Sequence, residues 1–373
     1  MRGRILFNGN GGSELVSRAA PYVRPAVAGR SAKVMMVTAA WGPGEYNEAP
    51  VRSALYAAGV APDVQAGHDR NVFNLCAWHT WTEFLQRRPD VAAVYREIES
   101  VTEALRSMYL EKTAFHADLI RRAARAGRER LAGFSIGRVR SRDFVRPESV
   151  QRGSELFERA LGRELVASID ALVENDARML EAFSDAELQL LARTGLRLDP
   201  EWREVRARLE ERILSADALL FFGGSPTKLL APFRFFDLAP ALLESLRRGA
   251  TFVASSAGAL VLCERMIVYD AHASDPLTRD FQLLDRGLGL VGGIQILPHC
   301  MDRIQTDDGD NLAYLARRFS QRICAGLNEE SYLLIELEGP TATSVGERDG
   351  VYVFGEDGVK TCYRSGERIS LEG

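Results

Sequence analysis

Residues 251–260 read Thr-Phe-Val-Ala-Ser-Ser-Ala-Gly-Ala-Leu, and this stretch decides the fold. A β-prone apolar run ends at two serines, and three small residues then lead into a helix-prone segment that extends to Met266. The order strand, tight turn, helix exposes a serine above a sheet, and small neighbours are needed because the turn is strained and other backbone approaches closely. The pattern predicts that Ser256 is a nucleophile; the alternative is an ordinary strand-to-helix turn with serine as the N-cap.

Two backbone positions are predicted to stabilise an oxyanion beside this serine. The N–H groups at a helix start can face an anion, which makes the Ala257 amide a candidate donor. A second donor is expected at Gly223 or Gly224, which end the buried strand-like run 219–222. Open α/β sheets place their chemistry at the carboxyl ends of strands, and paired glycines let amides face a substrate. A plain tight turn is the alternative. In either case Ser225, followed by Pro226, is expected to start the next helix.

A catalytic serine needs a base, and the base needs an orienting group. Two histidines follow Ser256 in the chain, His272 and His299. His299 comes directly after the alternating apolar run 294–298, which places it at the end of a strand. We therefore select His299 as the base and interpret His272, which lies in a polar loop, as a surface residue.

The orienting acid is expected among the aspartates near these two residues. The candidates between or just after them are Asp270, Asp275, Asp280, Asp285 and Asp302. We select Asp270 because it ends the apolar run 266–269, which fixes its position better than a place in the polar loop would.

The chain outside these motifs divides into two α/β parts separated by a helical stretch. Residues 1–70 predict a β-α-β-α-β opening with strands near 4–8, 33–39 and 60–64, and therefore a mostly parallel sheet. Residues 215–373 are expected to complete this α/β domain and to end in a β-meander packed at a sheet edge.

Residues 71–214 form the predicted helical insertion. Apolar residues recur there at three- and four-residue spacing, which predicts helices at about 80–132, with room for a break, 150–193 and 200–215. Arginine is dense between residues 121 and 152, which indicates either an anion-binding surface or a solvated face balanced by nearby acids. We favour the solvated face because the chain as a whole carries a net charge of −4.

Composition narrows the class of protein further. The 373 residues are 46% hydrophobic, which is ordinary for a globular chain, and the net charge gives no argument for nucleic acid. The five cysteines form no C-x-x-C pair, which fits a reducing compartment. We see no secretory signal or membrane span, and expect a cytoplasmic protein. His68, Cys76 and His79 lack a regularly spaced fourth ligand, so no metal site is predicted.

Three separated motifs, at Gly223-Gly224, 254–259 and 297–300, resemble those of the peptidase E and cyanophycinase family of serine peptidases. The resemblance covers 216–335 well and 1–65 weakly. It implies a class I glutamine amidotransferase-like fold, a three-layer α/β sandwich with a mostly parallel sheet.

The resemblance also implies roles for individual residues. Ser256 matches the family's nucleophile, His299 its base and Asp270 most nearly its acid. Gly224 and Ala257 match its oxyanion-hole glycine and post-nucleophile residue.

Other positions match less closely. Residues 326–330, Gly-Leu-Asn-Glu-Glu, resemble a later strand-end segment of the family, so Glu329 and Glu330 are expected near the site. The chain departs from the family pattern at Ser225 in place of Asn or Asp, Ala254 in place of Gly and Cys300 in place of an aromatic residue. After His299, an acidic segment replaces an Arg-rich one. The candidate substrate contacts are Gly223, Ser225, Arg303, Glu329 and Glu330.

The combined prediction is a serine hydrolase of amide bonds in small peptides or aspartyl-type conjugates, acting without a metal or organic cofactor. A second hypothesis is a non-catalytic binding or regulatory protein on the same scaffold, with the helical stretch as its working surface. A third is an acyl transferase or esterase that uses the same serine. The helical stretch itself is interpreted as a lid, a substrate platform or a homodimer surface.

Overall fold

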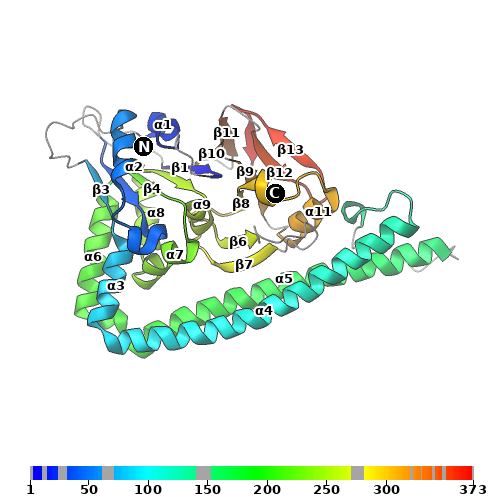
Figure 1. Cartoon of the computed structure of the whole chain (residues 1–373), viewed down its shortest axis with the longest axis horizontal. Coiled ribbons are helices and arrows are strands. Elements are labelled where there is room, and N and C mark those ends of the chain that lie inside the picture. The colour runs from blue at the N-terminus through cyan, green and yellow to red at the C-terminus, as the bar shows by residue number, and fades with distance from the viewer. Residues whose placement is uncertain are drawn as a thin grey trace.

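A computed structural model shows an α/β body with a long helical hairpin running along one side of it (Figure 1). It describes residues 3–10, 15–23, 32–60, 71–139, 153–269, 281–319, 322–328, 330–337, 341–346 and 350–371. Within these ranges, no helix is long and apolar enough to cross a membrane.

The body is built on an eight-stranded sheet. In spatial order its strands are β14 (Arg368–Ser370), β11 (Thr341–Gly346), β10 (Ser331–Glu336), β1 (Arg4–Asn8), β5 (Thr251–Ser255), β4 (Ala218–Phe221), β2 (Val34–Val37) and β3 (Val72–Asn74). The five strands from β1 to β3 are parallel, whereas β10, β11 and β14 join antiparallel to one another and to β1. The prediction of a mostly parallel sheet is confirmed for the five strands from β1 to β3.

Helices cover both faces of this sheet because successive strand residues point to opposite sides. Along β4, Leu219 and Phe221 join one apolar core, and Ala218 and Leu220 join the other. The first core also takes in residues from α6 (Pro200–Ser215), α7 (Pro226–Phe235), α8 (Ala239–Arg247) and α9 (Ala257–Leu262). The second takes in residues from α1 (Leu15–Ala19) and α2 (Ala49–Ala57). The result is a three-layer arrangement.

Two smaller sheets complete the body. One has the order β13 (Lys360–Tyr363), β12 (Val351–Phe354), β9 (Ile323–Leu327) and β8 (Ile294–Pro298). The other pairs β6 (Arg265–Tyr269) with β7 (Phe281–Arg286). The expected single C-terminal meander at a sheet edge is therefore corrected: β10 lies inside the main sheet beside β1, and β12 and β13 pair into the second sheet.

The predicted helices between the two α/β parts are confirmed as α3 (Ala77–Arg87), α4 (Pro89–Arg130), α5 (Gly153–Thr194) and α6. The break falls where Pro89 opens α4, since a residue before proline is disfavoured in the helical region. The strand expected near 60–64 is not the third strand of the sheet. That strand is β3, inside the range predicted to be helical, and residues 61–70 lie outside the described part.

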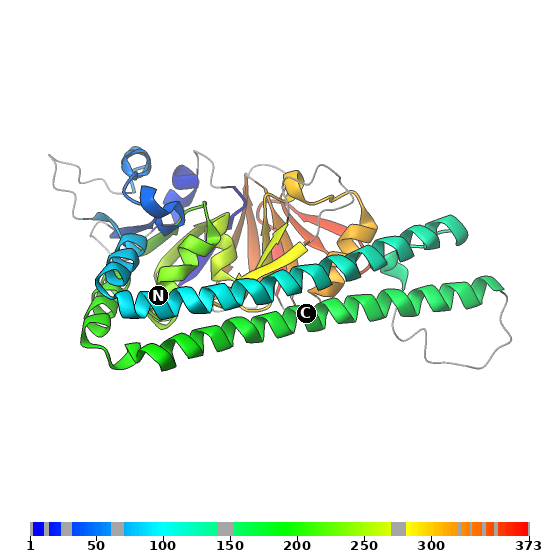
Figure 2. The same cartoon turned by 60° about the horizontal axis from the view of Figure 1, so that its bottom comes forward.

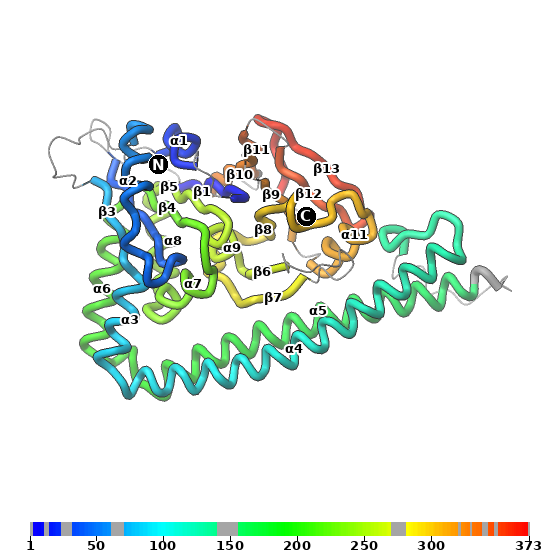
Figure 3. Tube along the Cα trace, in the orientation of Figure 1, coloured from blue at the N-terminus to red at the C-terminus, as the bar shows by residue number. Residues whose placement is uncertain are grey.

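The helices α4 and α5 form the antiparallel hairpin, with 42 residues each. At 1.5 Å per residue each helix is about 63 Å long. Figure 2 shows the two helices side by side along the body, and Figure 3 traces α5 passing next to β7. Tyr109, Leu165 and Leu172 of the hairpin share an apolar cluster with β7 and with α11 (Gly309–Arg318).

The arginines at the far end of the hairpin have partners of their own. Arg122 pairs with Asp118, Arg128 pairs with Asp310, and Arg130 stacks over the Phe157 ring at 5.2 Å. These contacts support a solvated face balanced by acids. The arginines between 140 and 152 lie outside the described residues.

Candidate active site

Ser256 lies in a strained turn between β5 and α9. Its φ of 48° and ψ of −109° are in a region that residues other than glycine rarely adopt. The turn leaves no room for larger neighbours, since a Cβ on Gly258 would lie 2.5 Å from the Phe221 carbonyl oxygen. The Ser256 hydroxyl does not cap α9, so the simple N-cap alternative is not what the structure shows.

The hydroxyl of Ser256 instead meets His299. The distance from Ser256 Oγ to His299 Nε2 is 2.8 Å. His299 follows β8 directly and has a left-handed backbone, with φ of 55° and ψ of 39°. Both residues are half-buried. The structure thus brings together the two side chains that the sequence selected as nucleophile and base.

The segment that carries His299 is held by two side chains that the sequence did not single out. The Tyr269 hydroxyl, at the end of β6, donates a hydrogen bond to the Pro298 carbonyl. The Met301 amide donates to Asn328 Oδ1 at 2.8 Å. Asn328 follows β9, and β9 pairs in parallel with β8, so the carboxyl ends of these strands meet at one edge.

The surroundings of the His299 imidazole favour its neutral form. Burial lowers the pKa of His299, and the Arg303 guanidinium lowers it further, whereas the Asp302 carboxylate opposes both effects. A lowered pKa leaves the ring unprotonated at neutral pH, and an unprotonated Nε2 accepts a hydrogen bond from a hydroxyl. The pair is therefore in the protonation state that a general base requires.

The Gly223-Gly224 turn lies against the serine. A Cβ on Gly223 would lie 3.2 Å from Ser256 Cβ and 3.7 Å from Ser256 Oγ. Gly224 has φ of 135°, and a Cβ there would lie 2.8 Å from the Ala40 carbonyl oxygen. Both positions therefore favour glycine, and Gly223 is the one that faces the serine side chain.

The 3-10 turn η2 (Ala39–Gly44) fixes this glycine turn in place. The Trp41 indole N–H donates to the Gly223 carbonyl at 3.0 Å, and the Ser225 amide donates to the Ala40 carbonyl at 3.0 Å. Ser225 Oγ accepts from the Lys228 amide at 3.3 Å, which confirms Ser225 as the N-cap of α7.

Of the other residues that the sequence selects for the site, two lie within the described part of the chain. Arg303 lies on the short helix α10 (Cys300–Arg303), and Glu330 is exposed just after β9. Asp270 and Glu329 lie outside the described residues, as does His272.

The cysteines in the motifs are not nucleophile candidates. Burial raises the pKa of Cys263 and of Cys300 to about 12, so both thiols stay protonated. Cys263 packs in the apolar core. His79, for which no metal site is predicted, has a protein partner: its Nδ1 lies 2.8 Å from Glu45 Oε2.

The fold and the site define an α/β protein in which a strained serine after a parallel strand meets a histidine at the sheet edge. Residues 172–343 match the model of Peptidase family S51. This match confirms, over these residues, the resemblance to the peptidase E and cyanophycinase family, and it supports a hydrolase.

The chain was also compared with solved structures and with curated protein sequences. The chain is similar to a solved structure described as a peptidase from an acI-B1 Actinobacterium, with 13% sequence identity and a TM-score of 0.47. That similarity covers 99% of this chain and 97% of the other. No curated protein sequence matches the chain.

Proposed function

We propose that this protein is a serine hydrolase that cleaves amide bonds in small peptides or aspartyl-type conjugates. The observation that carries the proposal is the 2.8 Å contact between Ser256 Oγ and His299 Nε2. The lowered pKa of His299 and the S51 family match support it. The choice of substrate follows the resemblance to peptidase E and cyanophycinase.

In the proposed reaction, Ser256 Oγ attacks the carbonyl carbon of the scissile amide. The new C–O bond forms as the hydroxyl proton passes to His299 Nε2 and the carbonyl electrons move onto oxygen. Collapse of this tetrahedral species breaks the C–N bond, and the imidazolium returns its proton to the leaving amine. Water then attacks the acyl-enzyme through the same histidine, which releases the acid and restores the serine.

The amides of Ala257 and Gly224 are proposed to bind the oxyanion. The start of α9 directly after the nucleophile supports the first assignment. The place of the glycine turn against Ser256 supports the second, with Gly223 as its alternative. Removal of one such donor typically reduces the rate by about 10²–10³.

Asp270 is proposed to orient His299. Its chain neighbour Tyr269 supports this role, because the Tyr269 hydroxyl bonds the carbonyl of the residue just before His299. An orienting carboxylate would hold the ring proton on Nδ1 and leave Nε2 free for the serine.

The test is a hydrolysis assay on a dipeptide library that includes α- and β-linked aspartyl dipeptides, read by mass spectrometry. We expect cleavage of a subset of these by the wild type and none by Ser256→Ala. Absence of cleavage across the library, together with an unreactive Ser256, would favour a non-catalytic protein on this scaffold. Cleavage of esters alone would favour the esterase alternative.

A further inference from the structure

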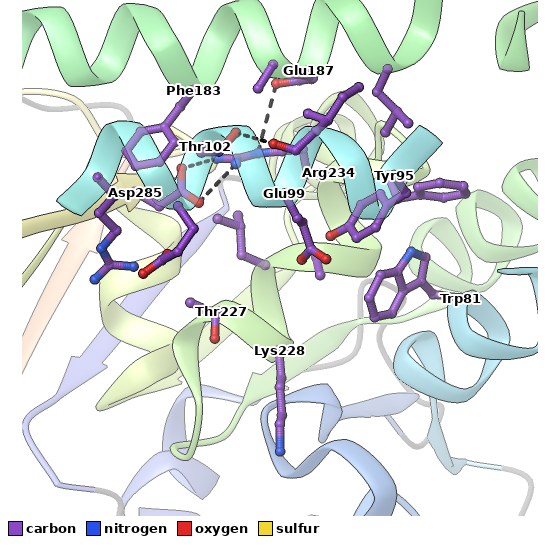
Figure 4. Close-up of a pocket in the computed structure, with 18 of the residues that line it drawn as sticks. Trp81, Tyr95, Glu99, Thr102, Phe183, Glu187, Thr227, Lys228, Arg234 and Asp285 are labelled. Carbon is purple, nitrogen blue, oxygen red and sulfur yellow. Dashed lines mark hydrogen bonds and ion pairs between the residues drawn. The ribbon is translucent and has the colours of Figure 1, made fainter. Parts of the chain in front are cut away.

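A cavity lies between the helical hairpin and the body, apart from the serine–histidine pair. It has a volume of about 590 Å³ and is lined by residues of α3, α4, α5, α7 and β7 (Figure 4). Neither Ser256 nor His299 lines it. Its floor reaches Thr227 and Lys228 in the first turn of α7, which follows the Gly223-Gly224 turn.

One end of this cavity is aromatic. The Trp78 and Trp81 rings lie 5.0 Å apart, and the Trp81 and Tyr95 rings lie 5.5 Å apart. Trp81 is only 7% exposed, and its indole N–H has no hydrogen-bond partner among the described residues. Buried donors usually have partners, so this N–H in the cavity wall is able to donate a hydrogen bond to a bound molecule.

An acidic side chain stands next to these rings. Glu99 lies one helical turn after Tyr95 on α4, and Figure 4 shows its carboxylate directed into the cavity. Burial raises the pKa of the Glu99 carboxyl against the opposing effect of the Tyr95 hydroxyl. Among the described residues Glu99 forms no ion pair; its hydrogen-bond partner is the Tyr95 hydroxyl, so the carboxylate lacks a counter-charge.

The basic groups around the cavity do not neutralise Glu99. Arg234 is held by Asp285 through two hydrogen bonds of 2.9 and 3.1 Å. Figure 4 shows the Lys228 ammonium pointing away from Glu99. Arg106 lies two turns further along α4, about 10 Å away along the helix axis. The remaining lining carboxylates are Glu103, three residues before Arg106 on α4, and Glu187, which pairs with Arg234 and Arg286.

We propose that the end of the cavity formed by Trp78, Trp81, Tyr95 and Glu99 binds an organic cation that carries an ammonium or guanidinium group. Aromatic faces attract such cations, and a neighbouring carboxylate adds a charged partner. The Lys228 ammonium lies 5.9 Å from the centre of the Trp78 ring, within the range of a cation–π contact at this end of the cavity. A neutral ligand of the same shape would gain the apolar contact but leave Glu99 without a counter-charge.

Titration of the full-length protein tests this directly, with tryptophan fluorescence and calorimetry as readouts. The probes are choline, agmatine and 3,3-dimethyl-1-butanol, which is the uncharged carbon isostere of choline. We expect saturable binding of choline or agmatine, and binding of the neutral isostere at least about tenfold weaker. Equal binding of choline and its isostere, or no saturable binding of either cation, would overturn the proposal.

Two substitutions locate the effect. Glu99→Gln is expected to weaken cation binding about tenfold, which is the loss of one charge-assisted contact. Glu111→Gln, on the exposed side of the same helix, is the matched control and should leave binding unchanged. Unchanged affinity in Glu99→Gln would contradict the assignment. The measurement needs no turnover and can be repeated in Ser256→Ala, so its outcome is independent of the proposed hydrolase.

Discussion

The hydroxyl oxygen of Ser256 lies 2.8 Å from Nε2 of His299, although the two residues follow strands of different sheets. Ser256 comes after β5 in the middle of the eight-stranded sheet, and His299 comes after β8 in the four-stranded sheet. Helix α9, which begins directly after Ser256, packs against β8, and Val261 of α9 and Ile296 of β8 lie in the same apolar core. The contact between Ser256 and His299 therefore depends on how the two sheets are packed against each other.

The strain at Ser256 predicts an unusual order of stabilities. Ser256→Gly removes the strain of the positive φ, whereas Ser256→Ala retains it. We expect the glycine variant to be more stable than the alanine variant by about 1 kcal/mol, with both inactive. Urea unfolding followed by circular dichroism measures this difference. If the alanine variant were as stable as the glycine variant, the backbone would carry no strain there.

The lowered pKa of His299 predicts the pH profile of any reaction at Ser256. The base works when deprotonated, so the rate should fall as pH drops through a pKa below the usual value near 6.5. Arg303→Gln removes a positive charge, favours the imidazolium and should move this acid limb to higher pH. Asp302→Asn should move it to lower pH. Reactivity of Ser256 measured from pH 4 to 8 gives these shifts, and shifts of opposite sign would refute the electrostatic account.

Gly258 tests how closely α9 approaches β4. A Cβ at this position would lie 2.5 Å from the Phe221 carbonyl oxygen, and because that contact is backbone the chain must move. We expect Gly258→Ala to cost about 1–3 kcal/mol and to reduce reactivity at Ser256. Gly292→Ala is the control, because its nearest neighbour would be a side-chain atom at 3.9 Å. Thermal and urea unfolding give the loss of stability in both variants. Equal losses in Gly258→Ala and Gly292→Ala would contradict the close packing inferred at Gly258.

The attachment of the hairpin to the body depends on a buried ion pair. Arg318 of α11 donates to both carboxylate oxygens of Asp176 of α5, at 2.7 and 2.8 Å, and both side chains are fully buried. Asp176→Ala leaves a buried guanidinium without its counter-charge and should cost about 3–5 kcal/mol of unfolding free energy.

An exposed pair on the same hairpin is the control for that prediction. Glu97 and Arg193 also form a two-point contact, but in solvent. Glu97→Ala should leave the unfolding midpoint nearly unchanged because solvent screens exposed pairs. Comparable losses in Asp176→Ala and Glu97→Ala would show that burial does not govern the contribution of the pair.

Local signals in the sequence were sufficient for much of the site. The small residues around Ser256 predict its strained turn, and the apolar run before His299 predicts a residue at a strand end. Ser225 followed by proline predicts the start of α7. Each of these features depends on neighbours in the chain, so its physical cause is visible in a short stretch.

Features that depend on distant pairing could not be found in this way. The edge strand β3 is only three residues long and adjoins the helices, so periodicity does not separate it from them. No short stretch of sequence indicates which of the C-terminal strands join the main sheet and which join the second sheet. Likewise, Tyr269 and Asn328 act on the His299 segment through hydrogen bonds from other strands, and no spacing in the sequence reveals those contacts.

The most direct test of the central claim is labelling with a fluorophosphonate probe, followed by intact mass and peptide mapping. The proteins compared are the wild type, Ser256→Ala and His299→Ala, each shown to be folded by circular dichroism. We expect one label per chain at Ser256 in the wild type, none in Ser256→Ala and a rate reduced by orders of magnitude in His299→Ala. Labelling that persists in Ser256→Ala, or that proceeds at an unchanged rate in His299→Ala, would contradict the central claim.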